Sequence, residues 1–365
     1  MNDMNEPMAE ATPSASFVEE VQNEVPRTDL TLFAEKIGAL KARIASIIVG
    51  QERTVDLVLT AILANGHVLI EGVPGVAKTL LARLTARLID AEFSRVQFTP
   101  DLMPSDVLGT TVFNLKTNEF DFHRGPVFAD VVLVDEINRA PAKTQSALFE
   151  VMEERQASID GSTYRMGELY TILATQNPVE QEGTYKLPEA QLDRFLMKIT
   201  MDYPSLEEEV SILERHHTNA ALVKLEDVHP VITRDELLAF RKLMDKVFVD
   251  RTLLQYIALI VQQTRTSKAV YLGASPRASV AMLQSSKAYA LLQGRDFVTP
   301  EDIKFVAPYV LQHRLILRSR NGRLFSGKGD ATAHRQSRGT EMRGELRWEK
   351  GEGRWEKEKL PLNID

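Results

Sequence analysis

A glycine-containing segment between a predicted strand and a predicted helix carries the strongest chemical signal in the sequence. It begins at Gly72 and ends in a lysine and a threonine. Backbone N–H groups of such a loop, and of the helix N-terminus that follows, can surround a phosphate. Lys78 is expected to reach the β- and γ-phosphates, and the Thr79 hydroxyl to bind Mg²⁺. The expected nucleotide contacts are Gly72, Val73, Pro74, Gly75, Val76, Ala77, Lys78, Thr79 and Leu80.

The residue before the lysine is Ala77, where the regular phosphate loop has glycine. Alanine carries a Cβ, so the loop must adopt backbone angles at this position that a side chain tolerates. Taken alone, the segment is also compatible with a glycine turn that binds nothing. The prediction therefore depends on further chemistry elsewhere in the chain.

Two carboxylates supply that chemistry, because Asp135 and Glu136 directly follow the four apolar residues 131–134. A buried strand rarely ends in two charges without a reason, since buried charge is costly. At the carboxyl end of a parallel strand both side chains lie on the ligand-binding edge of the sheet. Asp135 is expected to hold Mg²⁺ and Glu136 to act as the general base on an attacking water. A solvated strand end explains either residue singly, but not the pair downstream of a phosphate loop.

Three further polar residues occur where a nucleotide site could use them. Asn177 follows the predicted strand 170–174 and could hold the lytic water or sense the γ-phosphate, although Asn-Pro is also a common turn. Arg194 lies at the end of a helix just before the fifth predicted strand, where an arginine is ordinarily a salt-bridge partner. Arg277 lies near the start of a helix, where a cation opposes the helix dipole unless an anion is bound or the side chain is exposed.

The elements that must position these residues are predicted from apolar periodicity. Five short apolar runs separated by helices indicate a buried parallel sheet, at residues 67–70, 93–98, 131–134, 170–174 and 195–201. Apolar residues at a spacing of three and four predict helices over 32–47 and 55–62. Two hairpins are predicted as insertions, at 111–122 and at 157–165.

Beyond Pro204 the strand pattern stops and helix signals take over. Capping boxes begin at Ser205 and Thr233, and an N-cap followed by proline occurs at Ser275 and Thr299. The sequence therefore predicts an all-helical second domain after the α/β domain.

The two ends of the chain differ from the middle. Residues 1–30 hold seven acidic residues and one basic residue, which predicts a disordered leader. Residues 319–365 hold seven of the 19 glycines and repeat the sequence Arg-Trp-Glu-Lys at 347 and 354, and a disordered tail is expected. The predicted organisation is a leader (1–30), an α/β domain (31–204), a helical domain (205–318) and a charged, glycine-rich tail (319–365).

Composition excludes several classes of protein. The chain has 365 residues, 44 basic and 51 acidic, with a net charge of −7 and no cysteine. The absence of cysteine excludes a disulfide framework, a thiolate metal site and cysteine catalysis. The negative charge does not favour broad contact with nucleic acid or an anionic membrane. No apolar run is long enough for a transmembrane helix, and no secretory signal is evident, so a cytoplasmic protein is expected.

Taken together, these segments resemble the MoxR family of AAA+ ATPases over about residues 31–318. The resemblance rests on eight stretches: 48–51, 71–79, 97–106, 125–128, 134–141, 174–178, 192–195 and 273–277. MoxR proteins usually have alanine before the phosphate-loop lysine, as this chain does. Relatives usually continue in helix beyond the point matching Leu317, so the end of their second domain is expected to be missing or replaced here.

The resemblance implies roles for the remaining candidates. Asn177 corresponds to sensor 1, Arg194 to the arginine finger and Arg277 to sensor 2, while Ile48 and Val49 would contact adenine. The two hairpins resemble the helix-2 insert and the pre-sensor-1 hairpin. A ring is implied, typically a hexamer, with ATP and Mg²⁺ at subunit interfaces. A chaperone-like role in maturing protein complexes is also implied, often with partners that carry a von Willebrand A domain.

Three other functions compete with a protein-remodelling ATPase. A nucleic-acid motor is disfavoured by the net negative charge, although a basic pore loop could be hidden within it. A scaffold that binds ATP without hydrolysing it is disfavoured by the full set of Glu136, Asn177 and Arg194. The ATPase subunit of a metal chelatase is a close cousin that these motifs do not exclude.

Overall fold

The structure, a computed structural model, describes residues 28–177, 184–218 and 225–318, with the backbone of three short strands at 324–326, 346–349 and 354–357. The predicted leader lies outside these residues except for 28–30, and so does most of the predicted tail. Within the tail, β13 (Leu346–Glu349) pairs antiparallel with β14 (Arg354–Lys357). The two copies of the repeated sequence thus face one another, with Trp348 opposite Trp355.

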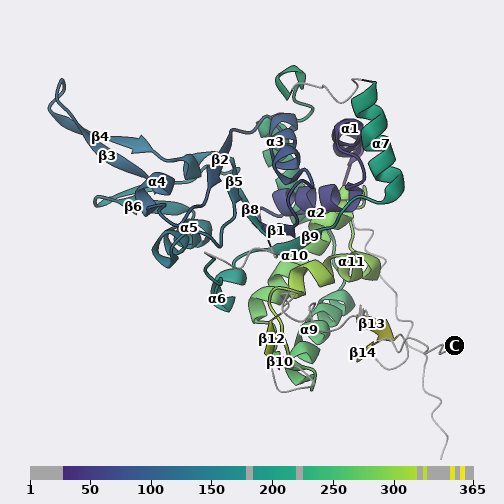
Figure 1. Cartoon of the computed structure of the whole chain (residues 1–365). Helices are drawn as coiled ribbons and strands as arrows, with labels where there is room; N and C mark the ends of the chain where they lie inside the picture. Colours follow the sequence, from purple (N-terminus) through teal and green to yellow (C-terminus); the bar gives the residue numbers. More distant parts are fainter. Residues whose placement is uncertain are drawn as a thin grey trace, which may run out of the picture.

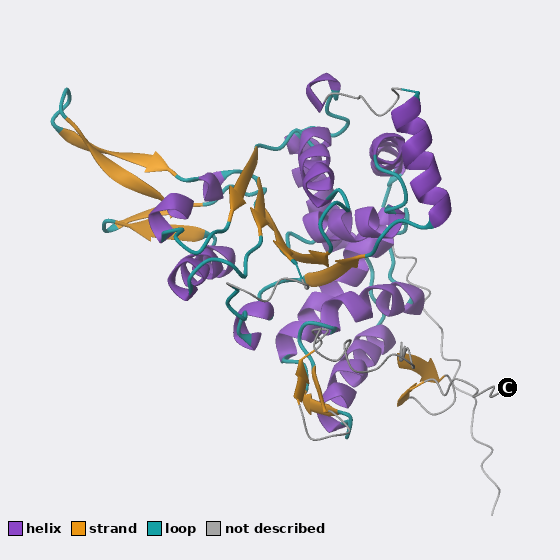
Figure 2. Cartoon of the chain, viewed as in Figure 1, coloured by secondary structure: helices purple, strands orange, loops and turns teal. Residues whose placement is uncertain are grey.

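A parallel sheet of five strands forms the centre of the α/β part, as the sequence predicts (Figures 1 and 2). Its strands are β1 (Val68–Gly72), β2 (Phe93–Gln97), β5 (Val131–Asp135), β8 (Thr171–Gln176) and β9 (Met197–Met201). Their spatial order is β2-β5-β8-β1-β9, and every neighbouring pair is parallel. All five carboxyl ends therefore share one edge of the sheet, here called the carboxyl edge, and all amino ends share the opposite amino edge.

Both faces of the sheet are covered, which explains why its strands are nearly continuous apolar runs. Alternate residues of a strand point to opposite faces, and those of β5 divide between two hydrophobic cores. Val132 and Val134 pack in a core with α5 (Ala142–Glu154). Val131 and Leu133 pack in the other core with three helices: α1 (Thr31–Ile47), α2 (Glu52–Leu63) and α3 (Lys78–Leu88).

Both predicted hairpins form. The first consists of β3 (Gly109–Asn114) and β4 (Glu119–Arg124), and follows the short helix α4 (Pro104–Leu108). The second consists of β6 (Gln156–Ile159) and β7 (Ser162–Arg165). Figure 1 shows both hairpins projecting from the same side of the sheet, the first one farther. The rings of Phe122 and Tyr164 stack with their centroids 4.1 Å apart and join the two hairpins.

The region after Pro204 is largely helical and begins its helices where the capping signals predict. The Ser205 hydroxyl accepts the N–H of Glu208, and the Thr233 hydroxyl accepts that of Glu236. No helix in the described part of the chain is long and apolar enough to cross a membrane. The helices are α7 (Leu206–His217), α8 (Arg234–Leu243), α9 (Arg251–Thr266), α10 (Pro276–Leu292) and α11 (Pro300–Leu311).

One expectation for this region is wrong, because it is not helical throughout. β10 (Val270–Leu272) pairs antiparallel with β11 (Ile316–Arg318), which pairs in turn with β12 (Leu324–Ser326). Strand-forming residues occur in β10, but three residues are too few to show an alternating pattern in a sequence. β12 also lies beyond residue 318, where the helical domain was expected to end.

The helical region packs closely on the α/β part. Arg241 of α8 donates to the carbonyl oxygen of Ile62 through Nε and Nη2, at 2.9 and 2.7 Å. Burial lowers the pKa of Arg241 to about 10. α10 packs along α2, and residues of both regions share one hydrophobic core. Both α8 and α10 of the helical region thus contact α2 of the α/β part.

Candidate functional site

The 72–79 loop connects β1 to α3 at the carboxyl edge of the sheet, where the sequence places it. Gly72 lies so close to β9 that a Cβ would meet the carbonyl oxygen of Met201 at 2.7 Å. Gly75 has open space around it but a φ of +89°, so the backbone conformation favours glycine there. Pro74 and Gly75 are exposed. The loop is therefore accessible to a ligand from solvent.

The structure explains why alanine can replace the usual glycine at position 77, before the lysine of the loop. Ala77 adopts the left-handed conformation with φ 58° and ψ 24°, which is uncommon but sterically allowed for a residue with a Cβ. α3 begins at the next residue and has no acidic residue in its first turn. Its N-terminal N–H groups can therefore attract an anion without a competing carboxylate on that turn. Lys78 lies across the loop, with Nζ donating to the Gly72 carbonyl oxygen at 2.6 Å.

The carboxylate of Asp135 is buried at the end of β5 and held by two neighbouring strands. Arg95 of β2 donates through Nε to Oδ2 at 2.6 Å, and the Thr175 hydroxyl of β8 donates to Oδ1 at 3.1 Å. The same hydroxyl accepts the backbone N–H of Glu136 at 3.0 Å. Sequence reasoning missed Arg95 and Thr175, because a polar residue inside a strand has no local signal that assigns it a partner.

Glu136 begins the chain reversal after β5 with a φ of +56°, an uncommon conformation for a residue with a side chain. Its carboxylate accepts a hydrogen bond from Gln97 Nε2 at 2.9 Å and pairs with Arg139 Nε at 3.0 Å. The side chain is 30% exposed. Glu136 is therefore both oriented by protein groups and open to water at the carboxyl edge. Gln97, the last residue of β2, is another neighbour that the sequence did not indicate.

Asn177 follows β8 directly and is buried. Since β8 lies between β5 and β1 in the sheet, the residues that follow these three strands are neighbours at the carboxyl edge. The structure thus brings together the 72–79 loop, the Asp135–Glu136 pair and Asn177.

The two candidate arginines lie at the opposite edge. Arg194 precedes β9, and its Nη1 pairs with Glu153 Oε2 at 3.1 Å. Glu153 is near the end of α5, which runs back from the carboxyl edge to the amino edge. Arg277, at the start of α10, pairs with the other oxygen, Oε1, at 2.6 Å. A five-residue strand spans roughly 16 Å, so both arginines are far from the 72–79 loop of their own chain.

A second carboxylate joins the same segments. Asp193 accepts Arg314 Nε on Oδ1 at 2.7 Å and the Ser275 hydroxyl on Oδ2 at 2.9 Å. Ser275 occupies the predicted N-cap position of α10, but its hydroxyl makes this contact and no capping hydrogen bond. Each of the two arginines therefore lies within two residues of a bond that joins the α/β part to α10.

Two buried histidines support the amino edge. His67 accepts the N–H of Ile172 on Nδ1 at 3.0 Å and donates from Nε2 to the Met152 carbonyl oxygen at 3.2 Å. Acceptance at Nδ1 needs the neutral ring, and burial lowers the pKa of His67 to about 3. His313 donates from Nε2 to the Phe195 carbonyl oxygen at 3.0 Å, and burial lowers its pKa well below the usual value.

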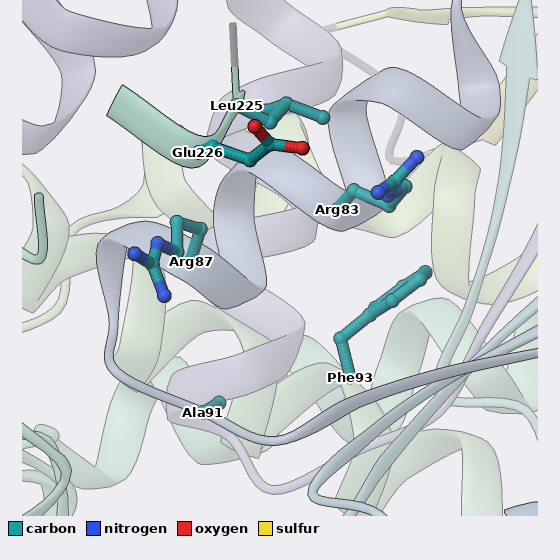
Figure 3. A pocket seen from close by; sticks show the side chains of 6 residues that line it. All are labelled: Arg83, Arg87, Ala91, Phe93, Leu225 and Glu226. Carbon is teal, nitrogen blue, oxygen red and sulfur yellow. The ribbon is translucent and has the colours of Figure 1, made fainter. Parts of the chain in front are cut away.

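Two cavities of the described part of the chain lie away from the 72–79 loop, since no residue of that loop lines either of them. One of about 230 Å³ lies between α1 and α2 and borders Ile48, for which the family resemblance implies an adenine contact. The other, about 370 Å³, lies beyond the middle of α3 (Figure 3). Its lining consists of Arg83, Arg87, Ala91, Phe93, Leu225 and Glu226.

The donors at the carboxyl edge fit Mg²⁺ held together with a nucleotide. No cluster of three or more His, Cys, Asp or Glu side chains able to hold a metal occurs among the described residues. Mg²⁺ is commonly bound by one or two protein oxygens together with substrate phosphates. The Thr79 hydroxyl and the Asp135 carboxylate supply oxygens of that kind.

Comparison with known proteins shows which family the chain belongs to. Residues 67–197 match the model of the ATPase family associated with various cellular activities (AAA), and residues 262–331 match the AAA lid domain. The chain is 47% identical over 281 residues to the uncharacterised protein YeaC of Bacillus subtilis, covering 77% of this chain and 87% of that protein. It is 46% identical over 280 residues to the chaperone MoxR1 of Mycobacterium tuberculosis, covering 74% and 73%. The chain belongs to the MoxR family of AAA+ ATPases.

The MoxR fold also agrees with a solved structure. A Cytophaga hutchinsonii protein of known structure matches with a TM-score of 0.72 and 41% identity, over 78% of this chain and 88% of that one. The lid match reaches residue 331, so the similarity extends beyond residue 318, where the sequence was expected to leave the family pattern. The lid of this MoxR-family chain therefore includes β12.

Proposed function

We propose that this MoxR-family chain hydrolyses ATP with Mg²⁺ in a ring of its own copies and uses the reaction to remodel or activate partner protein complexes. One observation carries the hydrolytic part. The 72–79 loop, Asp135–Glu136 and Asn177 follow three adjacent strands at the same edge of the sheet. One nucleotide triphosphate at that edge can contact all of them.

Each residue at the carboxyl edge has a definite task in this proposal. Lys78 and the loop N–H groups bind the phosphates, and Asn177 orients the attacking water. Thr79 and Asp135 would hold Mg²⁺, which neutralises charge on the phosphates. Glu136 takes a proton from the attacking water while the oxygen of that water forms a bond to the γ-phosphorus. The bond from the γ-phosphorus to the bridging oxygen breaks, and ADP and phosphate are released.

The distance between the two edges supports association of the chain with copies of itself. Arg194 and Arg277 are at the amino edge and cannot reach the loop of their own chain, so they would serve ATP on a neighbouring copy. A guanidinium stays protonated and suits the charge that develops on the γ-phosphate oxygens. We propose a hexamer, with ATP at each interface and with Ile48 and Val49 against adenine.

The proposed substrate is a protein complex, because the chain is 46% identical to a protein named as a chaperone. A von Willebrand A domain partner is part of this proposal. A nucleic-acid motor and a chelatase subunit remain the alternatives, and the net charge of −7 does not favour the first. Stimulation of ATP hydrolysis by DNA would favour a nucleic-acid motor. Recovery of chelatase subunits in a pull-down with this chain would favour the ATPase subunit of a chelatase.

The test has two stages. Purified protein should release phosphate from ATP with Mg²⁺ and stop when the metal is chelated; no hydrolysis by the assembled protein would overturn the proposal. Glu136→Gln, which keeps ATP bound, should then capture partner proteins from a lysate of the native organism. Lys78→Ala is the matched control, because it lacks bound ATP, and proteins captured equally by both variants do not count as substrates.

A further inference from the structure

Glu153 has no role in the proposed hydrolysis, yet its carboxylate contacts both arginines of the amino edge. Oε2 pairs with Arg194 Nη1 at 3.1 Å, and Oε1 pairs with Arg277 Nη2 at 2.6 Å. Arg277 Nη1 also lies 3.4 Å from Oε2. The three residues come from α5, from the segment before β9 and from α10. The carboxylate is therefore the only direct link between the two guanidinium groups that the described contacts show.

The charges of this cluster suit a phosphate that arrives from outside. Two guanidinium groups and one carboxylate leave a net charge of +1, so the cluster still attracts an anion. Arg194 donates two hydrogen bonds through Nη1, one to the Glu153 carboxylate and one to the Phe149 carbonyl oxygen. The Nε of Arg194 is buried and has no acceptor among the described residues. The resting contacts therefore leave one donor of Arg194 unpaired.

The backbone around Glu153 is fixed from several directions. The preceding residue, Met152, accepts a hydrogen bond from buried His67 through its carbonyl oxygen. Asp193 binds Ser275 and so joins the segments that carry the two arginines. A carboxylate on such a support can set the position of both guanidinium groups. Without it, two like charges would face each other and move apart.

We propose that Glu153 is a positioning residue that holds Arg194 and Arg277 together as a pair before the ATP of a neighbouring subunit reaches them. This inference rests on the proposed function, in which the two arginines act on a neighbour's nucleotide. Glu153 itself does not touch the nucleotide. It reduces the reorganisation that the arginines need when the γ-phosphate arrives, which is the general advantage of preorganised groups.

The first test is steady-state hydrolysis by the full-length Glu153→Gln variant. We expect kcat to fall by roughly 10- to 100-fold, as misplacement by about 1 Å can do, while each subunit keeps its affinity for ATP. Glu154→Gln is the matched control, since it removes the same charge from the next, exposed residue of α5. Glu153→Asp, which keeps the charge, should recover part of the loss. Unchanged or increased kcat in Glu153→Gln would overturn the proposal.

A second test separates positioning from a general defect. Mixed rings of Glu153→Gln and Lys78→Ala subunits should regain activity, because some interfaces then join an intact loop to correctly held arginines. In an Arg194→Ala, Arg277→Ala background, adding Glu153→Gln should cause no further loss. A further loss there, or failure to recover in mixed rings where Arg194→Ala does recover, would contradict the proposal.

The outcomes also separate this inference from the proposed function. If wild-type rings do not hydrolyse ATP, or if Arg194→Ala and Arg277→Ala are both fully active, the proposed function fails first. If these arginine variants are impaired and Glu153→Gln is not, only the role of Glu153 fails. Melting temperature and ring size of each variant show whether a loss of kcat accompanies a folded, assembled protein.

Discussion

The two edges of the sheet are built in different ways. At the carboxyl edge, the 72–79 loop, Asp135, Glu136 and Asn177 each lie at or directly after the end of a strand. Their positions follow from the strand order alone. At the amino edge, Arg194, Arg277 and Glu153 come from a short helix end, a lid helix and α5, and are joined by salt bridges. The backbone positions the residues of the carboxyl edge, whereas long-range side-chain contacts position those of the amino edge.

This difference divides the proposed reaction between two subunits. In the proposed function, the carboxyl edge would bind and cleave the nucleotide of its own chain, while the amino edge would serve the nucleotide of a neighbouring chain. Changes at the carboxyl edge should therefore disable the subunit that carries them. Changes at the amino edge should disable the adjacent site instead. Four experiments test this division.

Lys78→Ala should have the largest effect, because it removes the charge that the loop offers to the β- and γ-phosphates. We expect ATP binding to be lost and the fold to be retained, since Lys78 contributes little packing. Isothermal titration measures the affinity, and circular dichroism reports the fold. Lys143→Ala, at an exposed lysine of α5, is the control. A folded Lys78→Ala protein with normal affinity would refute the assignment of the loop.

Arg194→Ala should bind ATP normally and lose hydrolysis by about 10³–10⁵-fold, the range seen for arginines supplied in trans. Mixing it with Lys78→Ala should restore part of the activity, since some interfaces then have an intact loop and an intact arginine. The exposed Arg83→Ala serves as control. Full activity of Arg194→Ala alone would show that the amino edge takes no part in hydrolysis.

Glu136→Gln should bind ATP and hydrolyse it about 10²-fold or more slowly, because the amide keeps the shape of the side chain and loses the base. In contrast to Arg194→Ala, it should not be rescued by Lys78→Ala, since no interface then has both an intact loop and an intact base. Single-turnover hydrolysis measures the chemical step directly, with Glu154→Gln as the charge-matched control. Near-normal turnover would place the base elsewhere.

Lowering the pH should produce the smallest effect. It should reduce the free energy of unfolding through His67 at the amino edge. The pKa of His67 is about 3 in the folded chain and near 6.5 when unfolded. The neutral ring therefore stabilises the fold above pH 6.5, and this contribution is lost as the pH falls below 6.5. At pH 5.5 the loss is about 1 kcal/mol in the free energy of unfolding.

Chemical denaturation at pH 7.5 and 5.5 measures this effect. The pH-dependent loss should be smaller in His67→Gln, whatever the absolute stability of that variant. His216→Gln, at an exposed histidine of α7, should keep the dependence of the wild-type protein. Equal pH dependence in all three proteins would mean that His67 does not carry this sensitivity.

Several features could be predicted because they depend on residues close together in the chain. The five strands follow from apolar runs, the hairpin turn at Asp160-Gly161 from residues that tolerate positive φ, and the helix starts at Ser205 and Thr233 from capping boxes. The 72–79 loop and the Asp135–Glu136 pair were predicted for the same reason. In each case a few neighbouring residues specify both the local structure and the chemistry.

Only the tertiary structure decided which groups surround these residues. Nothing local in the sequence pairs Arg95 with Asp135, Gln97 with Glu136, or Glu153 with two arginines 41 and 124 residues away along the chain. Likewise, Ser275 has the sequence of an N-cap but its hydroxyl bonds to Asp193. A side-chain hydrogen bond extends only about 3 Å. Its partner is therefore set by how the sheet, α5 and the lid pack together, which a local sequence pattern does not encode.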